Sequence, residues 1–259
     1  MNQRAVETAP ATISELDGVR YLHLGTVWVQ GAMRIRKPHA IELEYVRRMM
    51  VWMLLVPKPQ RIVGHAVQLG LGAASITRFT HGVLRMMTTA IELNPTVIDA
   101  CRLCFHLPAD GPLLKVMQAD AADWVADAAN AGSVQVLNVD LYDHEAASPA
   151  LDSADFYRGC HRVLDDGGVM TVNLFGRDAS FERSARRIAA AFGPSQVWTL
   201  SPTRDGNTIV LAGKGVEMPD RGTLEMRAES IQSRYALPAR RWLRMIRPLP
   251  APHRRTIDA

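Results

Sequence analysis

Apolar and polar residues alternate with two different periods along the chain. Residues 19–36 alternate loosely around two glycines, a pattern typical of two or three short antiparallel strands. From Pro38 apolar residues recur at helical spacing until Pro57 stops the pattern. The sequence therefore predicts a small N-terminal β-module over residues 1–37, followed by a helix that leads into the main domain.

Strand-like runs then alternate with helix-like runs from Arg61 to Gly213. Such alternation predicts an α/β fold with a mostly parallel sheet and helices on both faces. The last two runs are separated only by the turn 201–207, so they should pair as an antiparallel hairpin. The predicted strands are 62–69, 86–93, 113–119, 134–139, 169–175, 196–200 and 208–213, and the predicted helices lie near 74–81, 95–105, 120–129, 152–164 and 178–192.

Seven strands that end in a hairpin have the layout of a Rossmann-like sheet of the class I methyltransferase type, by analogy of fold. We expect this domain to cover residues 38–215. Residues 216–259 should form a basic helical C-terminal appendix. The length of 259 residues accommodates one such domain and a small appendage.

Composition and charge exclude several classes of protein. The chain is 47% hydrophobic and 22% charged, and no apolar run reaches the roughly 18 residues that a membrane span needs. Three cysteines are too few for a disulfide framework, and the N-terminus lacks the apolar segment of a secretory signal, so we expect a cytoplasmic protein. Seven arginines lie between positions 234 and 255; we interpret them as a solvated face rather than a nucleic-acid interface.

Three strand ends carry residues suited to a nucleoside. The first strand runs into Gly70 and Gly72, where a ligand can approach the backbone near a helix start. The second ends at Glu92, whose carboxylate can accept both hydroxyls of a ribose. The third ends at Asp120, just before Ala121, where a purine edge would lie; Asp120 can equally cap the following helix.

Two carboxylates, Asp140 and Asp143, follow the fourth strand in a D-x-x-D pattern. Ligands bind beyond the carboxyl ends of strands in open α/β sheets, so these acids should face a substrate. Tyr142, between them, can stack on the nucleoside or simply pack. Asn173, at the end of the fifth strand, can line the same pocket.

A C-x-x-C pair, Cys101 and Cys104, lies inside a predicted helix. Zinc sites need about four ligands, and redox motifs of this type sit at helix starts. We therefore interpret the cysteines as small buried apolar residues and expect no metal.

Around the fourth and fifth strands the chain resembles the polyamine aminopropyltransferases, the spermidine synthase family. The resemblance covers about residues 19–213. It rests on the D-x-x-D acids, on the stretch that begins at Glu92, and on the family's F-Y and L-x-x-G-G motifs, matched here by Phe156, Tyr157, Leu164, Gly167 and Gly168.

The resemblance implies transfer of an aminopropyl group from decarboxylated S-adenosylmethionine to a putrescine-like amine. It assigns the role of general base to Asp140 and a role in holding the acceptor or the adenine side of the donor to Asp143. It assigns the ribose to Glu92 and the adenine to Asp120. It also implies a homodimer, as does the β-module, which is too small to be stable alone.

The sequence departs from the family in three places, which leaves alternatives open. Residues 70–74 contain no acid, whereas the family's glycine motif carries an aspartate for the donor's ammonium group. Tyr45 lies near the position of one family tyrosine, and a second family tyrosine meets the stretch that contains Arg204. One alternative is a methyltransferase that uses intact S-adenosylmethionine and an acidic acceptor held by Arg204. Another is a non-catalytic nucleoside-binding relative whose basic C-terminal segment contacts a partner.

Overall fold

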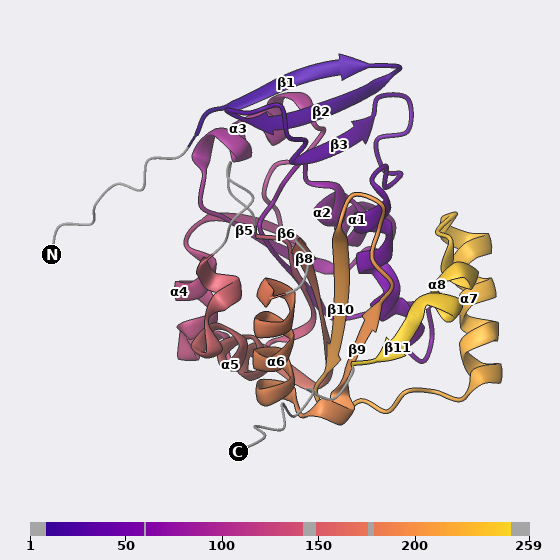
Figure 1. The fold of residues 1–259 in the computed structure, drawn as a ribbon. Coiled ribbons are helices and arrows are strands. Elements are labelled where there is room, and N and C mark those ends of the chain that lie inside the picture. The colour runs from indigo at the N-terminus through magenta and orange to yellow at the C-terminus, as the bar shows by residue number, and fades with distance from the viewer. Residues whose placement is uncertain (1–8, 60, 142–148, 176–178, 250–259) are drawn as a thin grey trace, which may run out of the picture.

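Two β-sheets make up the framework of the chain. The computed structural model describes residues 9–59, 61–141, 149–175 and 179–249. The smaller sheet is antiparallel and lies at the top of Figure 1, with strands β1 (Ala11–Leu16), β2 (Val19–Leu24) and β3 (Gly31–Arg34). The sequence pattern missed β1, because five of its six residues are exposed and give no alternation.

The larger sheet has eight strands in the order β11-β9-β10-β8-β7-β4-β5-β6. Strands β4 to β8 are parallel, and β9, β10 and β11 run antiparallel to their neighbours. The seven predicted strands and the terminal hairpin are confirmed. The strands are β4 (His65–Leu69), β5 (Met87–Glu92), β6 (Leu114–Gln118), β7 (Val134–Val139), β8 (Leu164–Phe175), β9 (Val197–Leu200), β10 (Asn207–Gly213) and β11 (Ile246–Pro248).

Helices cover both faces of this sheet, as Figure 1 shows: α4, α5 and α6 lie on one side, and α1, α7 and α8 on the other. Among the described residues every helix is too short or too polar to cross a membrane. The α-helices are α1 (Glu44–Met49), α2 (Ser75–Arg78), α3 (Pro95–Cys104), α4 (Ala121–Ala126), α5 (Ala154–Val163), α6 (Ala179–Phe192), α7 (Arg221–Tyr235) and α8 (Ala239–Met245). Shorter turns are 3-10 helices η1 (Met50–Leu54), η3 (Ala128–Asn130), η4 (Pro149–Asp152) and η5 (Pro194–Gln196) and the π-helical turn η2 (Phe79–Val83).

The first helix begins later than the sequence predicted. The apolar spacing that starts at Pro38 becomes helical only at Glu44 and then tightens into the 3-10 turn that ends at Leu54. All five residues of that turn are buried, so their side chains pack all round instead of along one stripe. This leaves α1 lying against the sheet with Tyr45 in its first turn.

Strand residues alternate between two hydrophobic cores, and this alternation sets the direction of the site residues. Val136 belongs to the core shared with α1, α7 and α8, whereas Leu137 belongs to the core shared with α4, α5 and α6. Because side chains two residues apart point to the same face, Asp140 lies on the α1 side of the sheet, in line with Val136. Asn173 on β8 follows Val169 on that side in the same way.

The C-terminal segment adds a strand to the main sheet. Helices α7 and α8 are present where a helical segment was expected, but Ile246–Pro248 forms β11 and pairs with β9 at the edge of the sheet. A strand of three residues is too short to give a sequence pattern. Ala228, Ile231 and Trp242 are fully buried in the α1-side core, so this segment covers part of the sheet.

Candidate active site

The site is built where β4 and β7 end side by side. The Gly70 N–H donates to Ile91 O, and the Asp140 N–H donates to Leu69 O, both at 2.9 Å. Gly70 has φ of +83°, and a Cβ there would lie 2.1 Å from the Asp140 carbonyl oxygen. Glycine is therefore required at position 70 so that the backbone of Asp140 can pass it. The glycine loop and the D-x-x-D acid form one structural unit.

The Asp140 carboxylate is held from two sides. Tyr45 Oη of α1 donates to Oδ2 at 3.2 Å, and Asn173 Nδ2 of β8 donates to Oδ1 at 2.8 Å. Burial raises the pKa of Asp140, and the hydrogen bonds from Asn173 and Tyr45 oppose that rise. A carboxylate that is oriented and partly desolvated in this way is suited to accept a proton from a substrate.

The β9–β10 turn reaches the same place. Asn207, the first residue of β10, donates from Nδ2 to Asn173 Oδ1 at 3.1 Å. The Thr203 hydroxyl lies 3.4 Å from Asn207 Oδ1, and the Asn207 N–H donates to that hydroxyl at 3.0 Å. No local sequence pattern indicates Asn207, because its contact depends on how β8 and β10 pair.

Glu92 ties the glycine loop to the end of β5. Its Oε2 accepts the Leu71 N–H at 2.8 Å, and its Oε1 accepts the Asn94 N–H at 2.9 Å. Burial raises the pKa of Glu92, and hydrogen bonds from backbone N–H groups oppose the rise. A carboxylate has about four acceptor sites, and these backbone groups do not fill all of them, so the contacts are compatible with the ribose role, which stays a prediction.

Asp120 caps a helix, which was one of its two expected roles. Its Oδ1 accepts the Ala122 N–H at 2.6 Å at the start of α4, and the residue is exposed. Ala121, the first residue of that helix, is buried. The capping bond uses one oxygen of the carboxylate and is compatible with a contact to adenine through the other, which stays a prediction.

A buried arginine lies beneath the glycine loop. The Arg78 guanidinium donates to the carbonyls of Ala73, Phe105 and Pro38. The residue is 2% exposed, and burial lowers its pKa to about 10. It joins the loop, the end of α3 and the chain that leaves the small sheet.

The small sheet contacts the glycine loop directly. Gly72 has φ of +50°, and a Cβ there would lie 3.0 Å from Gln30 O. A Cβ on Gly31 would lie 2.4 Å from the Ala73 nitrogen. The β2–β3 connection is therefore packed against the loop expected to meet the nucleoside, with no room for larger side chains at the contact.

Other expected residues are placed as follows. Tyr142 and Asp143 lie outside the described residues. Cys101 is buried and its thiol donates to Gly72 O at 3.0 Å, while Cys104 is half-buried, and both thiols are free. The described residues contain no group of three or more His, Cys, Asp or Glu side chains that could hold a metal.

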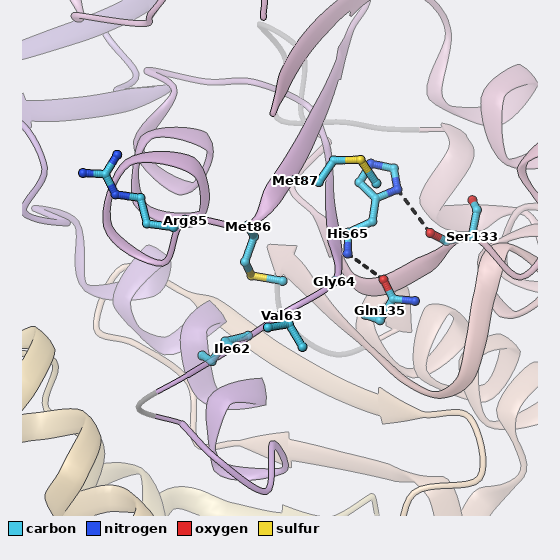
Figure 2. Close-up of a pocket in the computed structure, with 9 residues that line it drawn as sticks. All are labelled: Ile62, Val63, Gly64, His65, Arg85, Met86, Met87, Ser133 and Gln135. Carbon is cyan, nitrogen blue, oxygen red and sulfur yellow. Dashed lines mark hydrogen bonds between the residues drawn. The ribbon is translucent and has the colours of Figure 1, made fainter. Parts of the chain in front are cut away.

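A separate hollow of ≈ 490 Å³ lies at the opposite ends of the strands. Figure 2 shows it around His65, at the start of β4, and Met87, at the start of β5. His65 Nδ1 contacts Ser133 O at 3.2 Å, and its Nε2 contacts Thr89 Oγ1 at 2.8 Å. None of the predicted site residues lines this hollow, so it is distinct from the site at Asp140.

Known proteins are similar to this chain in sequence and in fold. No model of a known protein family matches the chain. A polyamine aminopropyltransferase of Chromobacterium violaceum is 32% identical over 236 residues, which cover 90% of this chain and 88% of the relative. This chain belongs to the polyamine aminopropyltransferase family. Membership confirms the family, the transferase class and the aminopropyl-transfer activity expected from the sequence, at the level of the family.

Solved structures show that the fold is shared more widely than the family. A probable spermidine synthase of Corynebacterium glutamicum has a TM-score of 0.69 and 19% identity, covering 88% of this chain and 85% of its own. Human methyltransferase-like protein 13, solved with SAH, has a TM-score of 0.65 and 20% identity, covering 83% and 98%. The aminopropyltransferase family and methyltransferases thus have one architecture in common, which confirms the expected fold class.

Proposed function

We propose that this protein transfers an aminopropyl group from decarboxylated S-adenosylmethionine to a putrescine-like diamine, with Asp140 as the general base. One observation carries the proposal: the Asp140 carboxylate is fixed between Tyr45 and Asn173 at the end of β7, next to the glycine loop. The family name of the relatives supports the same reaction.

The chemistry follows from this placement. The acceptor amine attacks the carbon next to the donor's sulfonium, the carbon–sulfur bond breaks, and a thioether nucleoside leaves. The amine must give up a proton so that its lone pair can attack, and Asp140 is the group that takes it. Burial raises the pKa of this carboxyl above its usual value, which increases its affinity for that proton.

The donor would lie across the ends of β4, β5 and β6. In this proposal Glu92 binds the ribose hydroxyls, and Asp120 with Ala121 contacts the adenine. The backbone of Gly70 and Gly72 would lie beside the donor at the loop. Tyr142 and Asp143 belong to the proposal on sequence grounds, as a stacking residue and a group for the cationic acceptor.

A second candidate is methyl transfer from intact S-adenosylmethionine. It is favoured by the glycine loop, where Ala73 and its neighbours supply no carboxylate for the aminopropyl ammonium. The guanidinium of Arg78 is bonded to Ala73 O in this loop, and its positive charge is unfavourable for a cation there. A charge-assisted hydrogen bond is worth about 1.5 to 3 kcal/mol, so the missing acid would weaken the decarboxylated donor by tenfold or more.

Calorimetric titration with both donors separates the candidates. Under the proposal, decarboxylated S-adenosylmethionine binds more tightly than S-adenosylmethionine at equal pH and salt. Tighter binding of the intact form supports methyl transfer, and binding of neither supports a non-catalytic relative. In turnover assays with putrescine, Asp140→Asn should lose at least a hundredfold in kcat while it still binds the donor; full turnover of this variant would refute the role of Asp140.

Assembly and location complete the proposal. We infer a homodimer, because the small β-module exposes Leu16 and Val27 in the isolated chain, with 65% and 89% of their surface accessible. The relevant measurement is sedimentation velocity, in which a monomer at micromolar concentration would contradict it. A small-molecule acceptor and a cytoplasmic location are proposed on the same family basis.

A further inference from the structure

The base stands at the end of a longer hydrogen-bond chain. Asn173 donates to Asp140, Asn207 donates to Asn173 Oδ1 at 3.1 Å, and the Thr203 hydroxyl faces Asn207 Oδ1 at 3.4 Å. Each amide presents its NH₂ group towards Asp140 and its oxygen towards the residue behind it. The chain therefore has one direction, and its final acceptor is the carboxylate.

Strand pairing brings the two asparagines together. Asn207 is opposite Phe175 in the β8–β10 ladder, and Asn173 lies two residues before Phe175 on the same face. Diagonal neighbours in an antiparallel pair are within reach of one another's side chains. The contact is thus fixed by the register of the hairpin rather than by a flexible loop.

The hairpin turn holds Asn207 in its orientation. Thr203 is buried, its N–H donates to Asn207 O at 2.8 Å, and its hydroxyl oxygen accepts the Asn207 N–H at 3.0 Å. The hydroxyl proton is then left for Asn207 Oδ1. Reversing the Asn207 amide alone would place its oxygen against Asn173 Oδ1, and reversing both amides would turn the Asn173 oxygen towards an ionised Asp140. Each of these arrangements contains one repulsive contact.

We propose that Asn207 is a positioning residue for the general base: acting through Asn173, it orients the Asp140 carboxylate and favours its ionised form. This inference rests on the proposed role of Asp140. Aligned hydrogen bonds in a low-dielectric site polarise one another, so a residue one step removed can change the properties of the terminal acceptor.

In the described part of the chain, the side chains that adjust the pKa of Asp140 are neutral. The pKa of Asp140 is raised by burial and lowered by Asn173 and Tyr45, with no contribution from an ionised side chain of known position. Arg204 and Asp205 on the turn are exposed. The ionisable side chains of α1 are Glu44, Tyr45, Arg47 and Arg48, and those of α2 and β5 are Arg78 and Glu92. His65 of β4 and Asp165 and Asp166 of β8 lie at the opposite ends of their strands.

The test is the isosteric variant Asn207→Asp, assayed with decarboxylated S-adenosylmethionine and putrescine across pH. The ionised carboxylate of this variant cannot donate, so the Asn173 amide should turn towards it and present its oxygen to Asp140. The acid limb of kcat/KM should then move up by about one pH unit, and activity should return to within about twofold of wild type at high pH. Asn207→Leu, which adds no charge, should shift the limb by about half as much.

Two controls make the result decisive. Asp205→Asn changes the charge of the same turn at an exposed position and should leave the acid limb unchanged. Urea unfolding checks that each variant is folded. An unchanged acid limb in Asn207→Asp, or a loss of activity that is equal at every pH, would overturn the inference. The proposed role of Asp140 as general base would still stand in that case if Asp140→Asn is inactive. If Asp140→Asn turns over normally, the proposed function fails and this inference fails with it.

Discussion

The phenolic oxygen of Tyr45 lies 3.2 Å from Oδ2 of Asp140, although the two residues come from different parts of the chain. Tyr45 is in the first turn of α1, and Asp140 directly follows β7. The resemblance to the family placed a tyrosine near position 45 without fixing its register. The structure places Tyr45 on the sheet-facing side of α1, from which its side chain reaches the end of β7.

Removing the Tyr45 hydroxyl should lower the fraction of Asp140 that is ionised, and so able to accept a proton, at neutral pH. In Tyr45→Phe the ionised Asp140 loses one donor, so its pKa rises further and less of it is ionised at neutral pH. We expect kcat/KM at pH 7 to be roughly threefold to tenfold lower. The acid limb of its pH profile should lie about 0.5 to 1 pH unit higher. Tyr235→Phe is the matched control, because its hydroxyl donates to Pro59 O at 2.9 Å, outside the site. Equal pH profiles for both variants would count against the role of Tyr45.

Asp140→Asn should stabilise the protein above neutral pH. Burial raises the pKa of Asp140 in the folded state above its value in the unfolded chain. The folded state therefore binds the proton more tightly, and the free energy of unfolding falls as pH rises from the unfolded pKa through the folded pKa. The variant has no such loss and should be more stable than wild type by about 1 kcal/mol at pH 8. Urea unfolding at pH 8 and pH 4 should show the difference shrinking at the lower pH; a variant less stable at pH 8 would contradict it.

Gly70→Ala should disrupt both the fold and the site. Its Cβ would collide with the Asp140 carbonyl oxygen at 2.1 Å, and its φ of +83° is itself unfavourable for alanine. We expect a loss of about 3 kcal/mol or more of stability and at least a tenfold loss of kcat. Gly132→Ala shares a positive φ, +63°, but meets nothing within 4 Å, so it should cost only about 1 to 2 kcal/mol and leave kcat unchanged. Similar costs for the two variants would show that backbone conformation alone matters.

Trp242→Ala should show that the C-terminal segment is part of the main folding unit. Trp242 of α8 is fully buried in the α1-side core, so its removal should cost about 3 to 5 kcal/mol and lower the single midpoint of urea unfolding. Met226→Ala on α7 is the control, because Met226 is 68% exposed and should change stability by less than about 0.5 kcal/mol. A separate, earlier transition in Trp242→Ala would instead mean that the segment unfolds on its own.

Sequence patterns predicted the central sheet well because its inner strands are buried on both faces. Strands such as β4 and β7 read as short apolar runs between turn residues, and these runs were located correctly. Strand β1 was missed because its residues are exposed, and β11 because it has only three residues. Both strands owe their existence to pairing with a neighbour, which local pattern does not record.

The residues of the site also fall into two groups, those that the sequence indicated and those that depend on packing. Asp140 and Asn173 were found because they end strands, a position that is visible in the sequence. The register of Tyr45 depends on how α1 packs, and the contact of Asn207 depends on the pairing of β8 with β10. The cap formed by Asp120 was predictable, because capping is local.

The shared burial of Trp52 and Trp242 also constrains synthesis of the chain. Trp52 leaves the ribosome long before Trp242, yet both belong to one core, and β11 closes the outer side of β9 only after residues 246–248 have been made. A nascent chain halted before α8 therefore carries an uncovered apolar surface and an open sheet edge, the two features that recruit chaperones and promote aggregation. Completion of this fold is a late, long-range event, governed by contacts between distant parts of the chain.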